Sequence, residues 1–374
     1  ICTRNNGFGY PIHVQIPRIK KSIPLFILFR ALGVMEDKKI SEYILLNLND
    51  SKMKKMAFSL KASIIEANKY LTQEAAFDFI KSHIIFTPMN MDKETGDLKK
   101  NEFTQSILDN DLYPHCFTKK QKIYFLGYMT NKLLRTSFGW RDPDDRDAYF
   151  NKRIDLTGTL LNNLFRNYFN KLVKDMTKQI VREINNGSWR STDNYNNIIN
   201  STNIYKIIKP TTIENGIKRA LATGDFGVKN PNSNKVGVAQ VLNRLTYIST
   251  LSHLRRINTP IDKSGKLIPP RKLHSTGWGY ICPAETPEGQ PVGVVKNISY
   301  LTHITIRSNS DTIHDIVNTR IKPINDCLPN ELYNKVKIFV NGCWLGTCEN
   351  PYEFYLFMKE KKRQGIINIY TSII

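Results

Sequence analysis

The segment that decides the fold of this 374-residue chain runs from residue 251 to residue 290 and reads LSHLRRINTPIDKSGKLIPPRKLHSTGWGYICPAETPEGQ. Glycine and proline recur along it, so most of it is expected to form loops. One of these loops carries Lys263 and Lys266, and Arg271 follows a stiff Pro-Pro pair. Cationic groups on a rigid loop can hold a nucleic acid by its phosphates, independently of base sequence. The segment therefore predicts a basic binding surface built from loops.

The residues around this segment extend the basic surface. A helix is predicted from Val238 to Arg256, because apolar residues recur at helical spacing and form a packing stripe. Arg255 and Arg256 end this helix, where two guanidinium groups suit either the negative end of the helix dipole or a phosphate. Between residues 218 and 299, twelve Lys and Arg residues stand against four acidic ones. Loops of this composition, carried on a scaffold, are typical of functional surfaces.

The charge of the whole chain points to the same class of partner. There are 54 Lys and Arg residues against 33 Asp and Glu residues, which gives a formal charge of +21 and a pI near 9.6. Such an excess favours polyanionic partners, most often nucleic acid. A membrane span is not expected, because the longest apolar run, Pro24–Phe29, is far shorter than the roughly 20 residues required. That run is predicted to be a buried strand.

The length predicts two to four domains. Ile1 stands where a start Met is expected and no secretory signal follows, so we expect the chain to be part of a longer intracellular protein. Local patterns predict a strand at His13–Pro17, helices at 43–48 (capped by Ser41), 75–84 (capped by Thr72), Gln121–Ser137 and Thr157–Asn185, a loop at Asn186–Ser201, and strands at Thr302–Ile306 and Lys337–Val340 with an Asn341-Gly342 turn.

No catalytic constellation is found in the sequence. A Gly-rich phosphate loop, a nucleophile elbow and a zinc-protease motif are all missing from it. The six cysteines form no CxxC pair, so zinc is not expected and free thiols are predicted. The acidic run Asp142–Asp147 could hold a hard cation, but it contains Arg146 and lacks the glycine and distal glutamate of a calcium loop. We interpret it as a turn between helices with capping aspartates and an internal ion pair.

The motifs of the decisive segment resemble a known family. LSHLRR at Leu251–Arg256, RKLH at Arg271–His274 and CPAETPEGQ at Cys282–Gln290 closely resemble the second-largest subunit of multisubunit RNA polymerases, in its eukaryotic, archaeal or large-DNA-virus form. The resemblance covers nearly the whole chain. Further matching motifs occur in the same order at Pro24–Gly33, Tyr124–Met129, Asp144–Asp155, Ala222–Gly227, Gln240–Arg244 and Phe339–Trp344.

The resemblance implies a fold and a set of site residues. It implies an α+β multidomain fold of the RNA polymerase β-subunit type, with mixed helical and antiparallel-strand domains. Its parts would be a lobe-like domain at 1–155, a protrusion-like return segment at 156–217, a fork-like domain at 218–299 and the start of an external domain at 300–374. Two fork loops are implied, at Asp225–Val236 and at Ile261–Ile268. The implied nucleic-acid-binding residues are Arg255, Arg256, Lys263, Lys266, Arg271, Glu288 and Gln290.

The resemblance also implies partners. They are the largest subunit and other core subunits, template DNA, the RNA–DNA hybrid and nucleoside triphosphates. Catalytic Mg²⁺ would be held mainly by the largest subunit, so no catalytic or metal-binding residue is expected here and the chain alone should be inactive. The location would be the nucleus for a eukaryotic protein, or the host cytoplasm or virion for a viral one. An alternative reading is a non-enzymatic, basic nucleic-acid-binding or assembly module derived from such a subunit.

Overall fold

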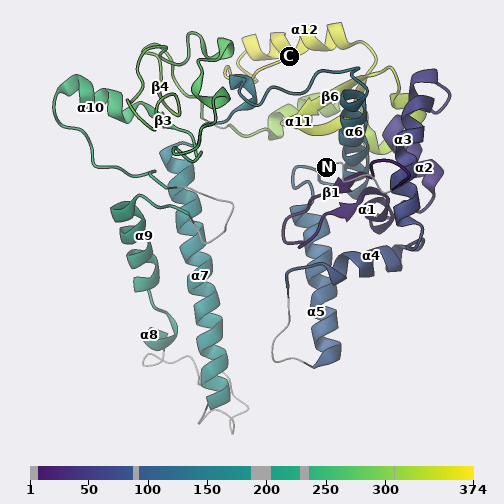
Figure 1. Cartoon of the computed structure of the whole chain (residues 1–374), viewed down its shortest axis with the longest axis horizontal. Helices are drawn as coiled ribbons and strands as arrows, with labels where there is room; N and C mark the ends of the chain where they lie inside the picture. The colour runs from purple at the N-terminus through teal and green to yellow at the C-terminus, as the bar shows by residue number, and fades with distance from the viewer. Residues whose placement is uncertain (1–6, 87–91, 187–203, 228–235, 307) are drawn as a thin grey trace. The chain divides into compact units, whose positions relative to one another are not determined.

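The chain folds into two compact units, each with helices and short antiparallel strands (Figure 1). The first unit combines Ile1–Pro143 with Ile306–Ile374, and the second unit is Asp144–Thr305. This mixture confirms the predicted α+β class, whereas the predicted domain boundaries at residues 155, 217 and 299 stay predictions. The computed structural model describes residues 7–86, 92–186, 204–227, 236–306 and 308–374.

The N-terminal part of the first unit is mainly helical. A two-stranded sheet pairs β1 with β2, and the helices that follow enclose one large apolar core. The elements are β1 (His13–Val14), β2 (Ile23–Pro24), α1 (Leu25–Ala31), α2 (Asp37–Leu45), α3 (Ser51–Ala67), α4 (Gln73–Ser82), α5 (Lys93–Ser106), a π-helical turn at Ile107–Asp111, and α6 (Lys119–Ser137). The predicted strand at His13–Pro17 is thus confirmed over its first two residues.

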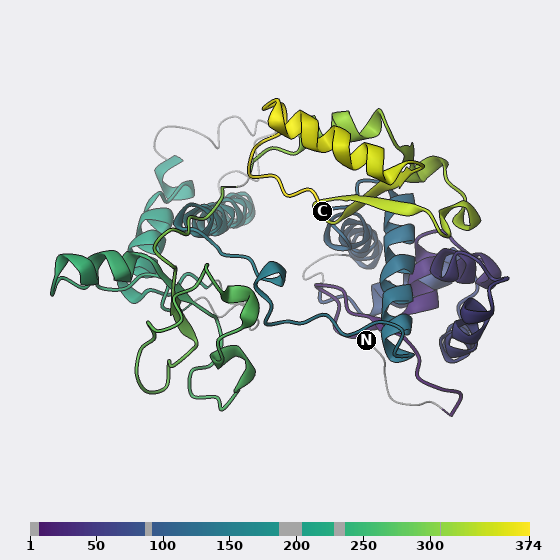
Figure 2. The ribbon, with the colours of Figure 1, turned by 90° about the horizontal axis from the view of Figure 1, so that it is seen from above.

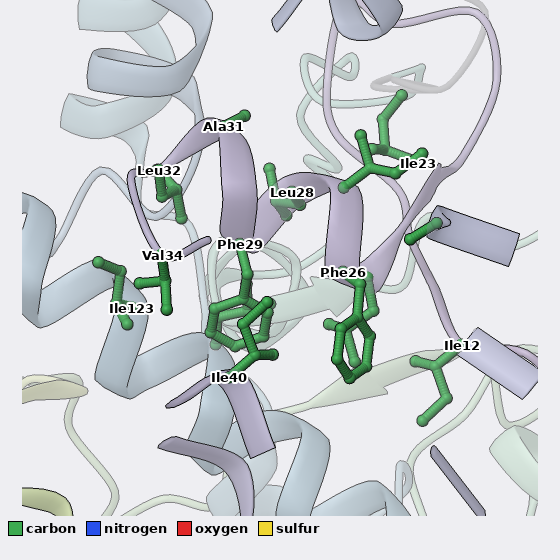
Figure 3. Packing of buried hydrophobic residues seen from close by; sticks show 14 of the residues in the cluster. Ile12, Ile23, Phe26, Leu28, Phe29, Ala31, Leu32, Val34, Ile40 and Ile123 are labelled. Carbon is green, nitrogen blue, oxygen red and sulfur yellow. The ribbon is translucent and has the colours of Figure 1, made fainter. Parts of the chain in front are cut away.

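Helix α1 lies at the centre of this core. The prediction of a buried strand at Pro24–Phe29 is confirmed for burial and for Pro24, which ends β2, but was wrong for Leu25–Phe29, which are helical. Every residue of α1 is buried, and Phe26 and Phe29 project from the same side of it (Figure 3). An apolar run gives no period that distinguishes a strand from a helix enclosed on all sides. Arg30 is also buried, and it donates to the carbonyl oxygens of Ala67 and Tyr70 and pairs with Asp37.

Capping side chains determine where several of these helices begin. Thr72 accepts a hydrogen bond from the Ala75 N–H, which confirms the predicted cap of α4. Thr118 and Gln121 form a capping box at the start of α6, the predicted helix. The predicted Ser41 cap was wrong: Ser41 lies inside α2 and donates to the carbonyl oxygen of Asp37, because the helix begins at Asp37, six residues before the predicted start at residue 43.

The C-terminal part of the first unit is a small sheet covered by helices. Strands β6 (Val336–Val340) and β7 (Cys343–Cys348) form the predicted hairpin, with Asn341 at a φ of 48° in its turn. Strand β5 (Lys322–Pro323) pairs with the other edge of β7. Helices α11 (Asp311–Asn318) and α12 (Pro351–Arg363) pack on this sheet (Figure 2). The predicted strand at Thr302–Ile306 was wrong, because this stretch has no regular structure.

The second unit begins with a pair of helices. Helix α7 (Thr157–Asn186) confirms the long predicted helix, and α9 (Thr211–Thr223) lies beside it after the short α8 (Ile204–Ile207) (Figure 1). Gly216 of α9 packs against the Tyr168 ring so closely that a Cβ atom would come within 2.3 Å of it. The predicted loop at Asn186–Ser201 and most of the loop at Asp225–Val236 lie outside the described residues.

The predicted helix from Val238 to Arg256 is only eight residues long. Helix α10 spans Tyr247–Leu254, because Thr246 and Ser249 form a capping box that starts the helix there. Upstream, Val241 and Leu245 are 96% and 86% exposed rather than packed. The predicted packing stripe was therefore wrong for this part of the chain. In the described part of the chain, no helix has the length and apolar character needed to cross a membrane.

Candidate nucleic-acid interface

The predicted interface is a set of loops closed at its base by a two-stranded sheet. Strand β3 (Arg256–Asn258) pairs with β4 (Val295–Asn297). Directly after β3, the Thr259 hydroxyl donates to the carbonyl oxygen of Val294 at 3.1 Å. The segment 259–294 therefore begins and ends at the β3–β4 sheet. The conformation of its loops depends on the contacts between them.

Arg271 provides that link. Its Nη2 donates to the carbonyl oxygens of Lys263 and Gly265 at 2.8 and 2.9 Å, and its Nη1 donates to those of Gln290 and Val292 at 2.5 and 2.8 Å. One planar guanidinium thus joins the basic loop to the loop that carries Gln290, with hydrogen bonds from a charged donor. We call Arg271 with these four carbonyl groups the Arg271 clamp.

Gly293 allows the second loop to come close enough for this clamp. Its φ is +70°, and a Cβ atom at this position would lie 2.1 Å from the Arg271 carbonyl oxygen. A side chain is therefore excluded by both backbone conformation and space. The Gly293 N–H donates to the Thr286 hydroxyl at 2.9 Å, and that hydroxyl donates to the carbonyl oxygen of Val295.

The basic loop at 261–268 is ordered by its own acidic residue. The Asp262 carboxylate accepts hydrogen bonds from the Ser264 hydroxyl and N–H at 2.7 and 3.0 Å, and these bonds lower the pKa of Asp262. Lys266 is exposed and Lys263 is half-buried. Among the described residues, neither lysine forms an ion pair. The loop therefore has a fixed backbone and two ammonium groups that remain available to an anion.

Arg255 and Arg256 have different environments. The Arg255 Nη2 donates to the carbonyl oxygens of Ser299, Tyr300 and Thr302 at 2.7, 3.2 and 3.0 Å, so this guanidinium holds the chain that follows β4. Arg256, the first residue of β3, is exposed. Arg255 supports the surface, and Arg256 extends its positive charge.

His253 fixes the stretch that leads into α10. Its Nδ1 accepts a hydrogen bond from the Asn243 N–H at 3.1 Å, so its Nε2 carries the proton and donates to the Gln240 Oε1 at 3.0 Å. One neutral tautomer therefore satisfies both contacts. This stretch is held by side-chain hydrogen bonds and not by the predicted helix.

The acidic run Asp142–Asp147 also supports the segment. The Asp145 carboxylate lies 2.7 Å from the His274 Nε2, and Asp147 pairs with Lys152 at 3.7 Å. The pKa of Asp145 is lowered by the Asp147 N–H and then by His274. The predicted internal ion pair is not formed by Asp145 or Asp147: in the described chain they pair with His274 and Lys152, which lie outside the run, and not with Arg146.

The structure thus sorts the predicted site residues by their contacts. Lys263, Arg271 and Gln290 meet in the Arg271 clamp. Glu288 and Gln290 have exposed side chains on the second loop, as Lys266 has on the first. Sequence reasoning missed the supporting role of Thr276, whose hydroxyl accepts from the Tyr149 N–H and bonds to His274. The contact between Thr276 and Tyr149 spans 127 residues of sequence and has no local pattern.

The described residues do not fit a magnesium site. No three His, Cys, Asp or Glu side chains among them converge as metal ligands. Within the segment, Asp262 is bound to Ser264, and the Glu285 carboxylate accepts a hydrogen bond from the Ser252 hydroxyl. Hard cations need several oxygen ligands together, which these two carboxylates do not provide. The arrangement is suited to holding an anionic backbone by charge and shape.

Two family models match the chain. RNA polymerase Rpb2, domain 2, matches residues 8–155, and RNA polymerase Rpb2, domain 3, matches residues 240–304. The second match contains the β3–β4 sheet, the basic loop and the Arg271 clamp.

Similar proteins come from eukaryotes and a large virus. The chain is 39% identical over 99% of its length to DNA-directed RNA polymerase II subunit RPB2 of Eremothecium gossypii, and 37% identical over 99% to DNA-directed RNA polymerase II subunit 2 of Arabidopsis thaliana. It is 32% identical over 97% to DNA-directed RNA polymerase subunit 2 of Acanthamoeba polyphaga mimivirus. It covers 29%, 30% and 31% of these proteins. The chain belongs to the family of second-largest subunits of DNA-directed RNA polymerases and corresponds to a segment of such a subunit.

Proposed function

We propose that this chain positions template DNA and the RNA–DNA hybrid within a DNA-directed RNA polymerase. The observation that carries the proposal is the basic loop at 261–268, whose backbone the Arg271 clamp fixes while Lys263 and Lys266 lack carboxylate partners among the described residues. A fixed loop of this kind can separate strands by its bulk and hold phosphates by its charge. Arg256, Glu288 and Gln290 complete the proposed contact surface.

The chemistry would be template-directed nucleotidyl transfer in an assembled enzyme. Mg²⁺, when bound, would stabilise the charge that develops at the reacting phosphate of a nucleoside triphosphate. Since the described residues do not fit such an ion, we propose that the largest subunit mainly holds it. The proposed partners are therefore the largest subunit, other core subunits, template DNA and the hybrid. The proposed cellular location depends on the source organism: it is the nucleus for a eukaryote, and the host cytoplasm or the virion for a large DNA virus.

The test is a double substitution, Lys263→Gln with Lys266→Gln, in the complete subunit assembled into polymerase. We expect a shorter lifetime of the elongation complex and a weaker salt dependence of scaffold binding, by about 0.9 in slope for each phosphate that the variant no longer neutralises. Lys171→Gln with Lys174→Gln is the matched control, since these exposed lysines lie on α7 of the same unit. Equal behaviour of the two double variants would refute the proposed role of the loop.

A measurement of RNA synthesis distinguishes the proposed function from the alternative, a non-enzymatic binding module. We expect the chain alone to synthesise no RNA, and its complete subunit to restore synthesis when combined with the other polymerase subunits. Binding of nucleic acid without restored synthesis in that reconstitution would favour the module.

A further inference from the structure

The first unit contains a second candidate site, away from the basic loop in the sequence. A hollow of about 490 Å³ lies between the C-terminal half of α6, the end of α2 and the hairpin β6–β7. Its floor includes the Trp344 ring, which is almost completely buried. This hollow is independent of the function proposed for the loop at 261–268.

The hollow is lined by cations and by no carboxylate. Lys132, Arg135, Arg141 and Lys337 all contribute to its wall. Within the described part of the chain, Lys132, Arg135 and Lys337 form no ion pair. Other lysines of the same unit do find acidic partners, including Lys39 with Glu36, Lys81 with Asp97 and Lys322 with Glu331. What sets this hollow apart is that three cations without an acidic partner among the described residues lie together in one concave wall.

Two of these cations, Arg135 and Lys337, lie close enough to repel each other. Burial lowers the pKa of the Lys337 ammonium, and the positive charge of Arg135 lowers it further. The Lys337 Nζ lies 5.7 Å from the centre of the Trp344 ring, and the Lys132 Nζ lies 4.9 Å from that of Tyr128. Aromatic faces partly compensate the cations. A bound anion would compensate them more completely.

The aromatic side chains that line the hollow, which we call the aromatic wall, limit the kind of anion that can bind there. Phe339 stacks on Trp344 with centroids 5.8 Å apart, and Tyr128 packs on Phe339 at 5.2 Å. Trp140, at the rim, stacks on Phe138 at 5.0 Å. Because these rings already cover one another, they do not leave a pair of open faces to sandwich a nucleobase. Single-stranded nucleic acid also needs an extended track with stacking platforms, which a hollow of this size does not provide.

We propose that this hollow binds an acidic peptide segment of a partner protein, with an apolar side chain inserted against the aromatic wall. Carboxylates of the peptide would pair with Lys132, Arg135 and Lys337. The volume accommodates a few side chains, and charge-assisted hydrogen bonds from the guanidinium fix their orientation.

The test measures binding of a fluorescein-labelled peptide of Asp and Glu with one central Phe to the 374-residue chain, by fluorescence anisotropy at physiological salt. The variant Arg135→Gln with Lys337→Gln should weaken binding by about tenfold or more. The control Lys93→Gln with Lys99→Gln removes the same charge from exposed positions of α5 and should change affinity less than about twofold. If the double variant does not fold, Arg135→Gln alone is measured in its place, because Arg135 is exposed.

Two results would overturn the proposal. In the first, the hollow and control variants show the same decrease in affinity, which would mean that the peptide responds only to the net charge of +21. In the second, a thymidine oligonucleotide of matched charge binds more tightly than the peptide and shows the same sensitivity to Arg135→Gln. Weaker binding when the central Phe of the peptide is replaced by Ser would support the apolar contact.

Discussion

Two arginines of the predicted interface, Arg255 and Arg271, act as supports for backbone. Sequence reasoning placed Arg255 and Arg271 against phosphates, because a guanidinium fork fits a phosphate well. The same fork fits backbone carbonyls, and the structure shows both residues donating to several of them. Contact with nucleic acid by these two side chains stays a prediction. Their bonds to carbonyl groups depend on residues up to 47 positions away, which no local pattern reveals.

The Arg271 clamp gives a prediction at this scale. Arg271→Ala should speed amide hydrogen exchange in the loops at 261–268 and 288–293 by at least about tenfold, since hydrogen bonds to a charged group contribute about 1.5–3 kcal/mol. The neighbouring Lys272→Ala is the control, because Lys272 is exposed. If exchange in both loops is the same in the two variants, Arg271 does not hold them.

Whole elements could be predicted where a local signal decided them. The cap of α4 by Thr72 and the Asn341-Gly342 turn between β6 and β7 are determined by adjacent residues, and both predictions are confirmed. Helix α1 could not be distinguished from a strand, because its surroundings on all sides are apolar. Helix α10 was predicted too long, since Val241 and Leu245 have helical spacing but no partner in the described chain to bury them.

A pair of substitutions tests this contrast between α1 and α10. Phe29→Ala should lower the free energy of unfolding by about 3–5 kcal/mol, because Phe29 is fully buried and its removal leaves a cavity. Ile248→Ala, on the exposed side of α10, should change it by less than about 0.5 kcal/mol. Urea unfolding followed by circular dichroism measures both. A decrease at Ile248 as large as that at Phe29 would contradict the structure.

The molecule as a whole combines a large positive charge with acidic groups that are stabilised in the folded state. The carboxyls of Asp50 and Asp145 have lowered pKa values, because of a hydrogen bond from Tyr333 and one from the Asp147 N–H respectively. The imidazole of His115 also has a lowered pKa, chiefly because it is buried. Its Nε2 has no hydrogen-bond partner among the described residues. All three groups bind protons more readily in the unfolded chain.

The pH dependence of stability follows from these shifts. As the pH falls below about 6.5, the unfolded chain protonates His115 before the folded chain does, so the free energy of unfolding decreases. A further decrease should begin below about pH 3.8, where the unfolded aspartates gain protons. His115→Phe should remove the first decrease and retain the second, as judged from urea midpoints across the pH range. An unchanged profile would show that His115 does not contribute.

The Arg271 clamp also has a consequence for the binding role proposed for the loop at 261–268. Its four carbonyl groups are satisfied within the chain, so the loop at 261–268 gives up its conformational freedom during folding and not at each encounter with a ligand. In the proposed role, a loop ordered in this way would meet each nucleic-acid ligand with the same backbone conformation. The strength of phosphate binding by Lys263 and Lys266 would then vary with ionic strength, while the conformation of the loop would not.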